Sequence, residues 1–139
     1  MPIRILIVEV HQPTQELIRE YLARDSKLSV VAETTDGAEA VTLAEQHRPD
    51  IVLMDIALKG MDGLKATKLI KKSCPTTEVI ILTNYPLDDW KERALESPQM
   101  VQWSAFLSKQ EIGKSLLPII NSLMAGKARL NQTTAPPAP

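Results

Sequence analysis

The chain has 139 residues, 16 basic and 17 acidic side chains and a formal net charge of −1. This length suits one domain whose core is large enough to fold without disulfides, and the single cysteine, Cys74, excludes a disulfide framework. The balanced charge and the 4% of aromatic residues argue against a nucleic-acid-binding surface, and no run of ~18 apolar residues predicts a membrane span. We therefore expect a soluble cytoplasmic protein that contacts neither membrane nor nucleic acid directly.

Strands and helices are predicted to alternate from the start of the chain. The β-branched run Ile3–Val8 predicts a buried central strand, and a helix follows over Gln12–Arg24. A less continuous strand over Leu28–Ala32 is expected at the sheet edge. Asp36 precedes a helix over Ala38–His47 with the spacing of a capping box.

The central stretch of the sequence is a short apolar run that ends on an acid. Ile51–Met54 is too short for a globular helix and too continuous for a half-exposed strand, so it predicts a strand buried on both faces. Asp55 lies at its carboxyl end, where open α/β sheets place functional residues, although Asp is also common where strands end. Asp62 is expected to cap a helix that begins at Gly63.

The second half of the chain continues the alternation and then changes composition. Three elements are predicted here, a strand over Val79–Thr83, a weaker helix over Leu87–Glu96 and a strand over Ser104–Ser108. A last helix covers Ile112–Ala125. Because proline is tolerated only in a first turn, Pro118 predicts that this helix proper begins near Ser115, and Gly126 is expected to cap it. Residues 127–139 have linker composition, so we divide the chain into a domain over 1–126 and a disordered Pro-rich tail over 127–139.

Five strands that alternate with five helices indicate an α/β fold. The expected architecture is a flavodoxin-like, doubly wound, five-stranded parallel sheet of order 2-1-3-4-5, with helices on both faces. In such a sheet the carboxyl ends of the strands share one edge. Polar residues stand at four of these ends, namely Glu9, Asp55, Thr83 and Lys109.

Together these four residues predict a phosphoryl-transfer site. A carboxylate can attack phosphorus once the charge of the phosphoryl group is neutralised, a lysine supplies positive charge, and a hydroxyl supplies a hydrogen bond. Each residue alone has a structural explanation: Glu9 as a solvated strand end, Thr83 as a strand former and Lys109 as a surface charge. Their occurrence at successive strand ends favours the functional interpretation.

The sequence resembles the receiver domain of bacterial two-component response regulators, of the subgroup often fused to a helix-turn-helix output domain. The resemblance covers residues 3 to about 125 and rests on four motifs, at residues 5–11, 50–63, 79–83 and 106–109. It implies that Asp55 accepts a phosphoryl group from a histidine kinase or phosphotransfer protein. It also implies that Lys109 pairs with the phosphoryl oxygens and that Thr83 and Phe106 form a switch pair.

The resemblance further implies a Mg²⁺ site made by Glu9, Asp55 and the backbone carbonyl of Ala57. The family has a second acid after the first strand, and here Val10 takes its place. Losing one charge and one oxygen ligand should weaken Mg²⁺ binding, because this ion requires oxygen ligands in near-octahedral geometry. His11 is a poor substitute, since imidazole suits softer metals.

Three functions are compatible with these observations. The first is a phosphorylation-controlled signalling receiver, which is no metabolic enzyme and at most catalyses its own phosphorylation and dephosphorylation. The second is a phosphate-independent interaction module with a degraded Mg²⁺ site. The third, an enzyme on the same fold, lacks a glycine-rich phosphate loop, a nucleophile elbow and a metal-ligand cluster. For either receiver, the resemblance implies that a downstream protein or a second copy binds the face formed by the fourth helix, fifth strand and fifth helix.

Overall fold

The computed structural model describes residues 2–58, 60–84 and 104–132, the last six as backbone only. Its elements, in chain order, are β1 Ile3–Val8, α1 Gln12–Leu22, β2 Leu28–Thr34, α2 Gly37–His47, β3 Ile51–Asp55, α3 Gly63–Ser73, β4 Glu78–Thr83, β5 Ala105–Ser108, the 3-10 turn η1 Lys109–Glu111 and α5 Ile112–Gln132. The helix expected over Leu87–Glu96 lies outside the described residues.

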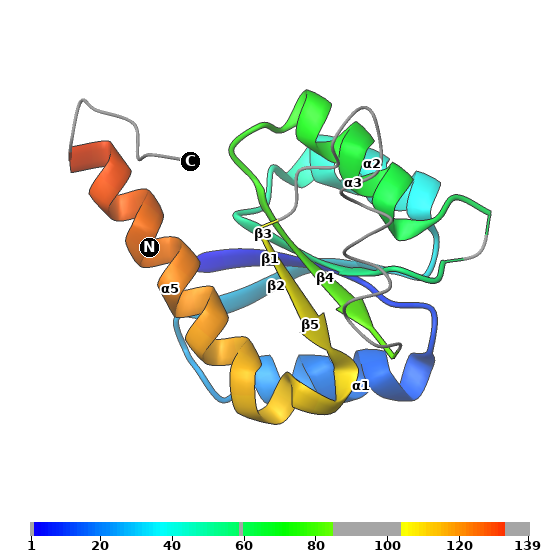
Figure 1. The fold of residues 1–139 in the computed structure, drawn as a ribbon, viewed down its shortest axis with the longest axis horizontal. Helices are drawn as coiled ribbons and strands as arrows, with labels where there is room; N and C mark the ends of the chain where they lie inside the picture. Colours follow the sequence, from blue (N-terminus) through cyan, green and yellow to red (C-terminus); the bar gives the residue numbers. More distant parts are fainter. Residues whose placement is uncertain (1, 59, 85–103, 133–139) are drawn as a thin grey trace.

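The five strands form one parallel sheet in the order β2-β1-β3-β4-β5 (Figure 1). The predicted fold class is therefore confirmed, and β2 is an edge strand as expected. Helices α1 and α5 cover one face of the sheet, and α2 and α3 cover the other (Figure 1). None of the helices in the described ranges combines the length and apolar character needed to cross a bilayer.

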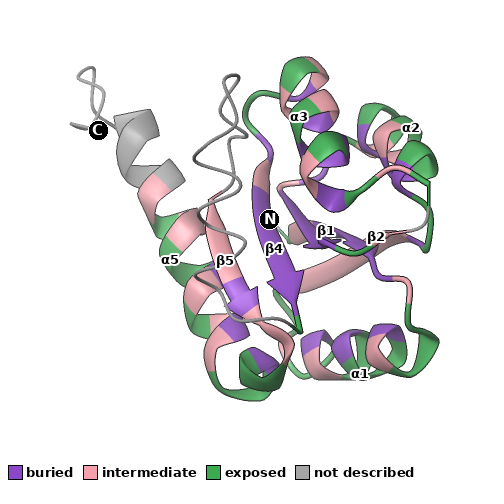
Figure 2. Cartoon of the chain, turned by 45° about the vertical axis from the view of Figure 1, so that its right-hand side comes forward, coloured by how far each residue is buried: buried purple, intermediate pink, exposed green. Residues whose placement is uncertain are grey.

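The three inner strands are continuous apolar runs because the core has two halves. In β1, Ile5 and Ile7 pack under α1 and α5, whereas Leu6 and Val8 pack under α2 and α3. The same alternation recurs in β3 and β4, and β4 is purple almost throughout in Figure 2. A strand with a helix layer on each face has no exposed side, so each position favours an apolar side chain.

The predicted N-caps Asp36 and Asp62 are confirmed, but the capping box is not, because the Asp36 N–H donates to Thr34 Oγ1 and not to Glu39. Asp36 accepts a hydrogen bond from the Ala38 N–H at 3.0 Å, and Asp62 accepts one from the Lys65 N–H at 2.8 Å. Arg48, with φ of 47°, ends α2 in the left-handed region. The Asp36 and Asp62 side chains thus accept hydrogen bonds from N–H groups that have no partner within the first turn of a helix.

Two predictions about the last helix are wrong. The helix α5 begins at Ile112, not near Ser115, so Pro118 lies in its interior. An interior proline costs about 3 kcal/mol, but each fully buried aliphatic side chain contributes about 1.5–3 kcal/mol. Three such side chains of α5, Ile112, Leu116 and Ile120, are buried against the sheet, so packing outweighs the proline.

The expected cap at Gly126 is also wrong, because α5 continues to Gln132. The first six residues assigned to the tail are therefore helical. The boundary between a domain over 1–126 and a tail stays a prediction, and residues 133–139 lie outside the described residues.

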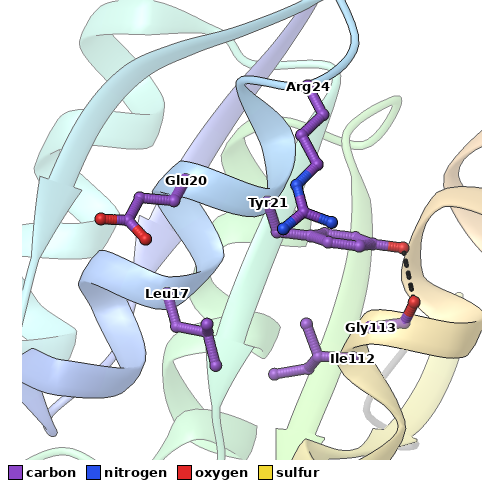
Figure 3. Close-up of a pocket in the computed structure, with 6 residues that line it drawn as sticks. All are labelled: Leu17, Glu20, Tyr21, Arg24, Ile112 and Gly113. Carbon is purple, nitrogen blue, oxygen red and sulfur yellow. Dashed lines mark hydrogen bonds between the residues drawn. The ribbon is translucent and has the colours of Figure 1, made fainter.

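A shallow groove of about 150 Å³ lies between α1 and the start of α5 (Figure 3). The Tyr21 hydroxyl donates a hydrogen bond to the Gly113 carbonyl at 3.3 Å, and the Arg24 guanidinium lies 5.8 Å from the Tyr21 ring centroid. Leu17 at the groove is 57% exposed. This contact links the amino-terminal end of α5 to α1.

Candidate functional site

The polar residues predicted at the strand ends occupy one edge of the sheet. Glu9 directly follows β1, Asp55 ends β3, Thr83 ends β4, and Lys109 directly follows β5. The strand registers align these ends, with Asp55 opposite Leu82 and Thr83 opposite Ser108. Glu9, Asp55 and Thr83 are at most 1% exposed.

A lysine joins the two acids of this edge. The Lys109 Nζ lies 2.8 Å and 2.9 Å from the two Glu9 oxygens and 3.2 Å from Asp55 Oδ2. Its side chain is only 9% exposed, so all three charges are largely shielded from water. Removing charges from water is costly unless they are paired, and two acids share one base here. The cluster therefore retains an excess of negative charge.

Backbone N–H groups hold the two carboxylates in place. Asp55 Oδ1 accepts a hydrogen bond from the Ala57 N–H at 3.1 Å, and Asp55 Oδ2 accepts one from the Val10 N–H at 3.2 Å. Glu9 Oε2 accepts a hydrogen bond from the His11 N–H at 3.0 Å. Val10 thus contributes through its backbone, which any residue other than proline could supply.

The two acids differ in their protonation. Burial, together with the hydrogen bond and negative charge of Asp55, raises the pKa of Glu9 to about 7, against the opposing effects of Lys109 and the His11 N–H. Burial also acts to raise the pKa of Asp55, but the hydrogen bond with Glu9, the Lys109 charge and the two backbone donors hold that pKa below its usual value. Near neutral pH, Asp55 is the ionised acid and Glu9 exchanges a proton.

An open cavity of about 420 Å³ gives access to Asp55. Its lining residues are Val10, His11, Thr14, Asp55, Ile56, Ala57, Asn84 and Lys109. Thr14 and Asn84 were missed by the sequence analysis. Thr14 Oγ1 lies 2.7 Å from the His11 ring Nδ1 in the first turn of α1, and Asn84 directly follows β4. Position next to a strand end was the signal that could have identified Asn84.

The oxygen atoms of the site are of the kind that bind a hard cation. Glu9 Oε1 is buried and, although in ion-pair contact with Lys109, accepts no hydrogen bond. Carboxylate oxygens such as those of Glu9 and Asp55, and the backbone carbonyl of the lining residue Ala57, are oxygen donors of the type that Mg²⁺ binds. Within the described residues there is no cluster of three or more His, Cys, Asp or Glu ligands. The set fits Mg²⁺ in kind, and Val10, which lines the cavity, supplies no further carboxylate.

Comparison with known proteins relates this site to one family. The family model for the response regulator receiver domain matches residues 5–121. The response regulator protein VraR of Staphylococcus saprophyticus is 39% identical over 97 residues, which are 70% of this chain and 46% of VraR. The chain thus spans about half the length of the curated relatives it matches.

Solved structures give the same result. A two-component response regulator of the LuxR family from Aurantimonas sp. is 29% identical, with a TM-score of 0.81 over 91% of this chain and 87% of that one. The receiver domain of a sensor histidine kinase from Pseudomonas aeruginosa, with a magnesium ion coordinated in its active site cleft, is 28% identical, with a TM-score of 0.77 over 90% of this chain and 99% of that one.

The matched region contains the sheet except for the first two residues of β1, and it includes the edge with Glu9, Asp55, Thr83 and Lys109. Receiver domains bind Mg²⁺ and receive phosphoryl groups from histidine kinases, and the oxygen donors described above agree with that chemistry. The chain belongs to the response regulator receiver domain family and is a signal-transduction domain of two-component systems.

Proposed function

We propose that Asp55 is the phosphoacceptor, taking a phosphoryl group from a phosphohistidine of a histidine kinase or phosphotransfer protein. An Asp55 carboxylate oxygen forms a bond to phosphorus, the phosphorus–nitrogen bond breaks, and the released imidazole keeps the electron pair of that bond and takes up a proton. The observation that carries this proposal is the state of Asp55: a carboxylate kept ionised at a cavity edge, 3.2 Å from the Lys109 ammonium. Lys109 is placed to move from Asp55 to the incoming phosphoryl oxygens.

Glu9, Asp55 and the Ala57 carbonyl would hold Mg²⁺, which when bound neutralises charge on the phosphoryl oxygens. Binding should be weak for two reasons. The Val10 side chain supplies neither charge nor oxygen, and Glu9, whose pKa is raised to about 7, is partly protonated at neutral pH. A bound ion must displace that proton and compete with Lys109 for the same carboxylate.

Thr83 and Phe106 are proposed as the switch pair, with Thr83 moving to the phosphoryl group and Phe106 turning inward behind it. Two observations support the pairing. Ile81, two residues before Thr83, lies opposite Phe106 in the β4–β5 register, so Thr83 and Phe106 project from the same face of the sheet. Phe106 is only partly buried and packs against the half of the core under α2 and α3, so it can become more buried.

A downstream protein or a second copy of the chain is proposed to bind the face of β5 and α5 together with the helix predicted over Leu87–Glu96. Phe106 of the switch pair lies on β5, a strand of that face, so its movement alters the face directly. The balanced charge supports a domain that binds no nucleic acid itself. We further propose a cytoplasmic protein that is no metabolic enzyme, at most catalysing its own phosphorylation and dephosphorylation.

Labelling with acetyl phosphate at fixed Mg²⁺ tests the proposal on wild type, Val10→Asp and Asp55→Asn. Wild type should label slowly and Asp55→Asn not at all. Val10→Asp should bind Mg²⁺ more tightly and label about tenfold faster, equivalent to ~1.4 kcal/mol of transition-state stabilisation. If wild type labels as fast as Val10→Asp, the second acid is not needed. If neither labels, the domain is a phosphate-independent interaction module.

A further inference from the structure

The loop between β3 and α3, described at residues 56–58 and 60–62, carries backbone groups of the site. The Ala57 N–H donates to Asp55 Oδ1, and the Ala57 carbonyl belongs to the proposed cation ligands. At the end of the loop the Gly63 N–H donates to the Ile56 carbonyl at 3.0 Å. A Cβ on Gly63 would lie 2.3 Å from the Asp55 carbonyl oxygen, so α3 begins directly against the acceptor's backbone.

A second glycine touches the same loop from another helix. Gly37 is the first residue of α2, and it is buried. A Cβ on Gly37 would lie 2.8 Å from the Met61 carbonyl oxygen, 3.2 Å from Met61 Cβ and 3.4 Å from Leu58 Cδ1. The first distance is shorter than real Cβ contacts allow, and its partner is backbone, so a methyl group here must displace the loop or the start of α2.

The turn that presents Gly37 to the loop is itself fixed. This turn, residues 34–37, joins β2 to α2. Thr34 Oγ1 accepts a hydrogen bond from the Asp36 N–H at 3.1 Å, and Asp36 caps α2. The Thr34 carbonyl also accepts a hydrogen bond from the Glu9 N–H at 3.0 Å. The turn therefore contacts both segments that carry the acids of the site, one through Thr34 and the other through Gly37.

We propose that Gly37 is a positioning residue for phosphoryl transfer. Its missing side chain lets α2 close against Met61 and hold the loop so that the Ala57 N–H meets Asp55 Oδ1. This inference rests on the proposed phosphoacceptor role of Asp55. Gly37 itself touches no reacting atom. Small displacements of such a support reduce rates strongly, because misplacing reacting groups by ~1 Å can cost on the order of 100-fold.

The chain offers a matched control for a test. Gly113 is the second residue of α5, and a Cβ there has nothing within 4 Å. Gly37→Ala and Gly113→Ala thus add the same methyl group near the start of a helix, one against the loop and one in open space. Two quantities are measured well below the unfolding temperature: the rate of acetyl-phosphate labelling and the NMR resonance of the Ala57 amide.

Gly37→Ala should slow labelling by at least about tenfold and move the Ala57 amide resonance, and Gly113→Ala should leave both unchanged. A variant that is merely less stable would keep the wild-type resonance and rate in its folded molecules. A wild-type Ala57 resonance in Gly37→Ala, or equal slowing by Gly113→Ala, overturns the proposal.

Leu58→Ala provides a second variant. The Leu58 side chain is half-buried beside Gly37, and truncating it removes this packing without adding bulk. It should move the Ala57 resonance and slow labelling less than Gly37→Ala does. If Gly37→Ala does not fold, a wild-type resonance and rate in Leu58→Ala overturn the proposal. If wild type itself is not labelled, the phosphoacceptor function fails, whereas the Ala57 resonance still reports whether Gly37 positions the loop.

Discussion

At the amino-terminal edge of the sheet, charged and polar side chains bond mainly to backbone groups, whereas at the carboxyl edge two buried acids accept backbone hydrogen bonds and also share one lysine. The Arg4 N–H donates to Asp50 Oδ2 at 2.9 Å, and the buried Thr77 hydroxyl donates to the Pro49 carbonyl at 2.8 Å. The Lys71 Nζ donates to the carbonyls of Pro75 and Thr77 at 2.8 Å and 2.7 Å. Donors and acceptors are matched there, and the result is a stable junction between strands and helices.

The carboxyl edge is organised differently. Two buried acids share Lys109, one of their oxygens accepts no hydrogen bond, and the pKa of Glu9 is raised to about 7. This arrangement stabilises the fold less than matched groups would, but it leaves a carboxylate and an ammonium ready for an incoming group. Proteins tolerate such unfavourable arrangements mainly where they serve function.

The largest expected effect is found by replacing one lysine at each edge of the sheet with methionine. Lys109→Met should reduce acetyl-phosphate labelling of Asp55 by about 10²–10³-fold, because the charge facing the phosphoryl oxygens is lost. Lys71→Met, at the other edge, should leave labelling unchanged and only lower the free energy of unfolding. Labelling rates and urea unfolding of both variants measure this. Similar labelling by the two variants would show that Lys109 is structural.

The next effect concerns pH in the absence of metal. Folded Glu9 keeps its proton up to about pH 7, whereas unfolded Glu9 releases it near 4.5. Glu9 therefore contributes stability below pH 4.5 that is lost as pH rises to 7, by at most about 3 kcal/mol. Asp55, whose pKa is lowered, changes stability only at more acidic pH.

Relative to Glu9→Gln, wild type should accordingly lose stability between pH 4.5 and 7 and stay level above that range. Urea unfolding across this range provides the measurement. Parallel curves for the two proteins would mean that Glu9 titrates alike in the folded and unfolded states.

A smaller effect is expected from the amino-terminal edge alone. Thr77→Val removes the hydroxyl that bonds to Pro49 and leaves a buried carbonyl with one partner fewer, at a cost of about 1–2 kcal/mol in unfolding free energy. The loss should be the same at pH 5 and pH 7.5, and labelling of Asp55 should not change. A slower labelling rate in this variant would show that the two edges are coupled.

The smallest effect is expected at the carboxyl terminus. Residues 133–139 contain three prolines and no apolar periodicity, so deleting them should leave the thermal midpoint unchanged. Thermal unfolding of the deleted and full chains is the test. A drop of several degrees would place these residues in contact with the domain.

The sequence alone determined the sheet and the positions of its polar ends. Continuous apolar runs such as Ile51–Met54 can only be strands covered on both faces, and the parallel order then brings Glu9, Asp55 and Lys109 to one edge. The caps Asp36 and Asp62 were also predictable, since they act on backbone groups two or three residues away. These features depend on neighbours along the chain or on the regular parallel arrangement of the strands in the sheet.

The tertiary structure decided what depends on distant partners. Pro118 lies inside α5 because residues of that helix pack on the sheet, which outweighs a local rule about proline. Glu9 acquires a raised pKa because burial and Asp55 act on it together, although 46 positions separate the two acids in the chain. The contact of Gly37 with Met61 likewise arises where two helices begin side by side. Local patterns specify which element a residue joins, whereas only the packed fold sets its distances to other elements, and both protonation and steric contact depend on those distances.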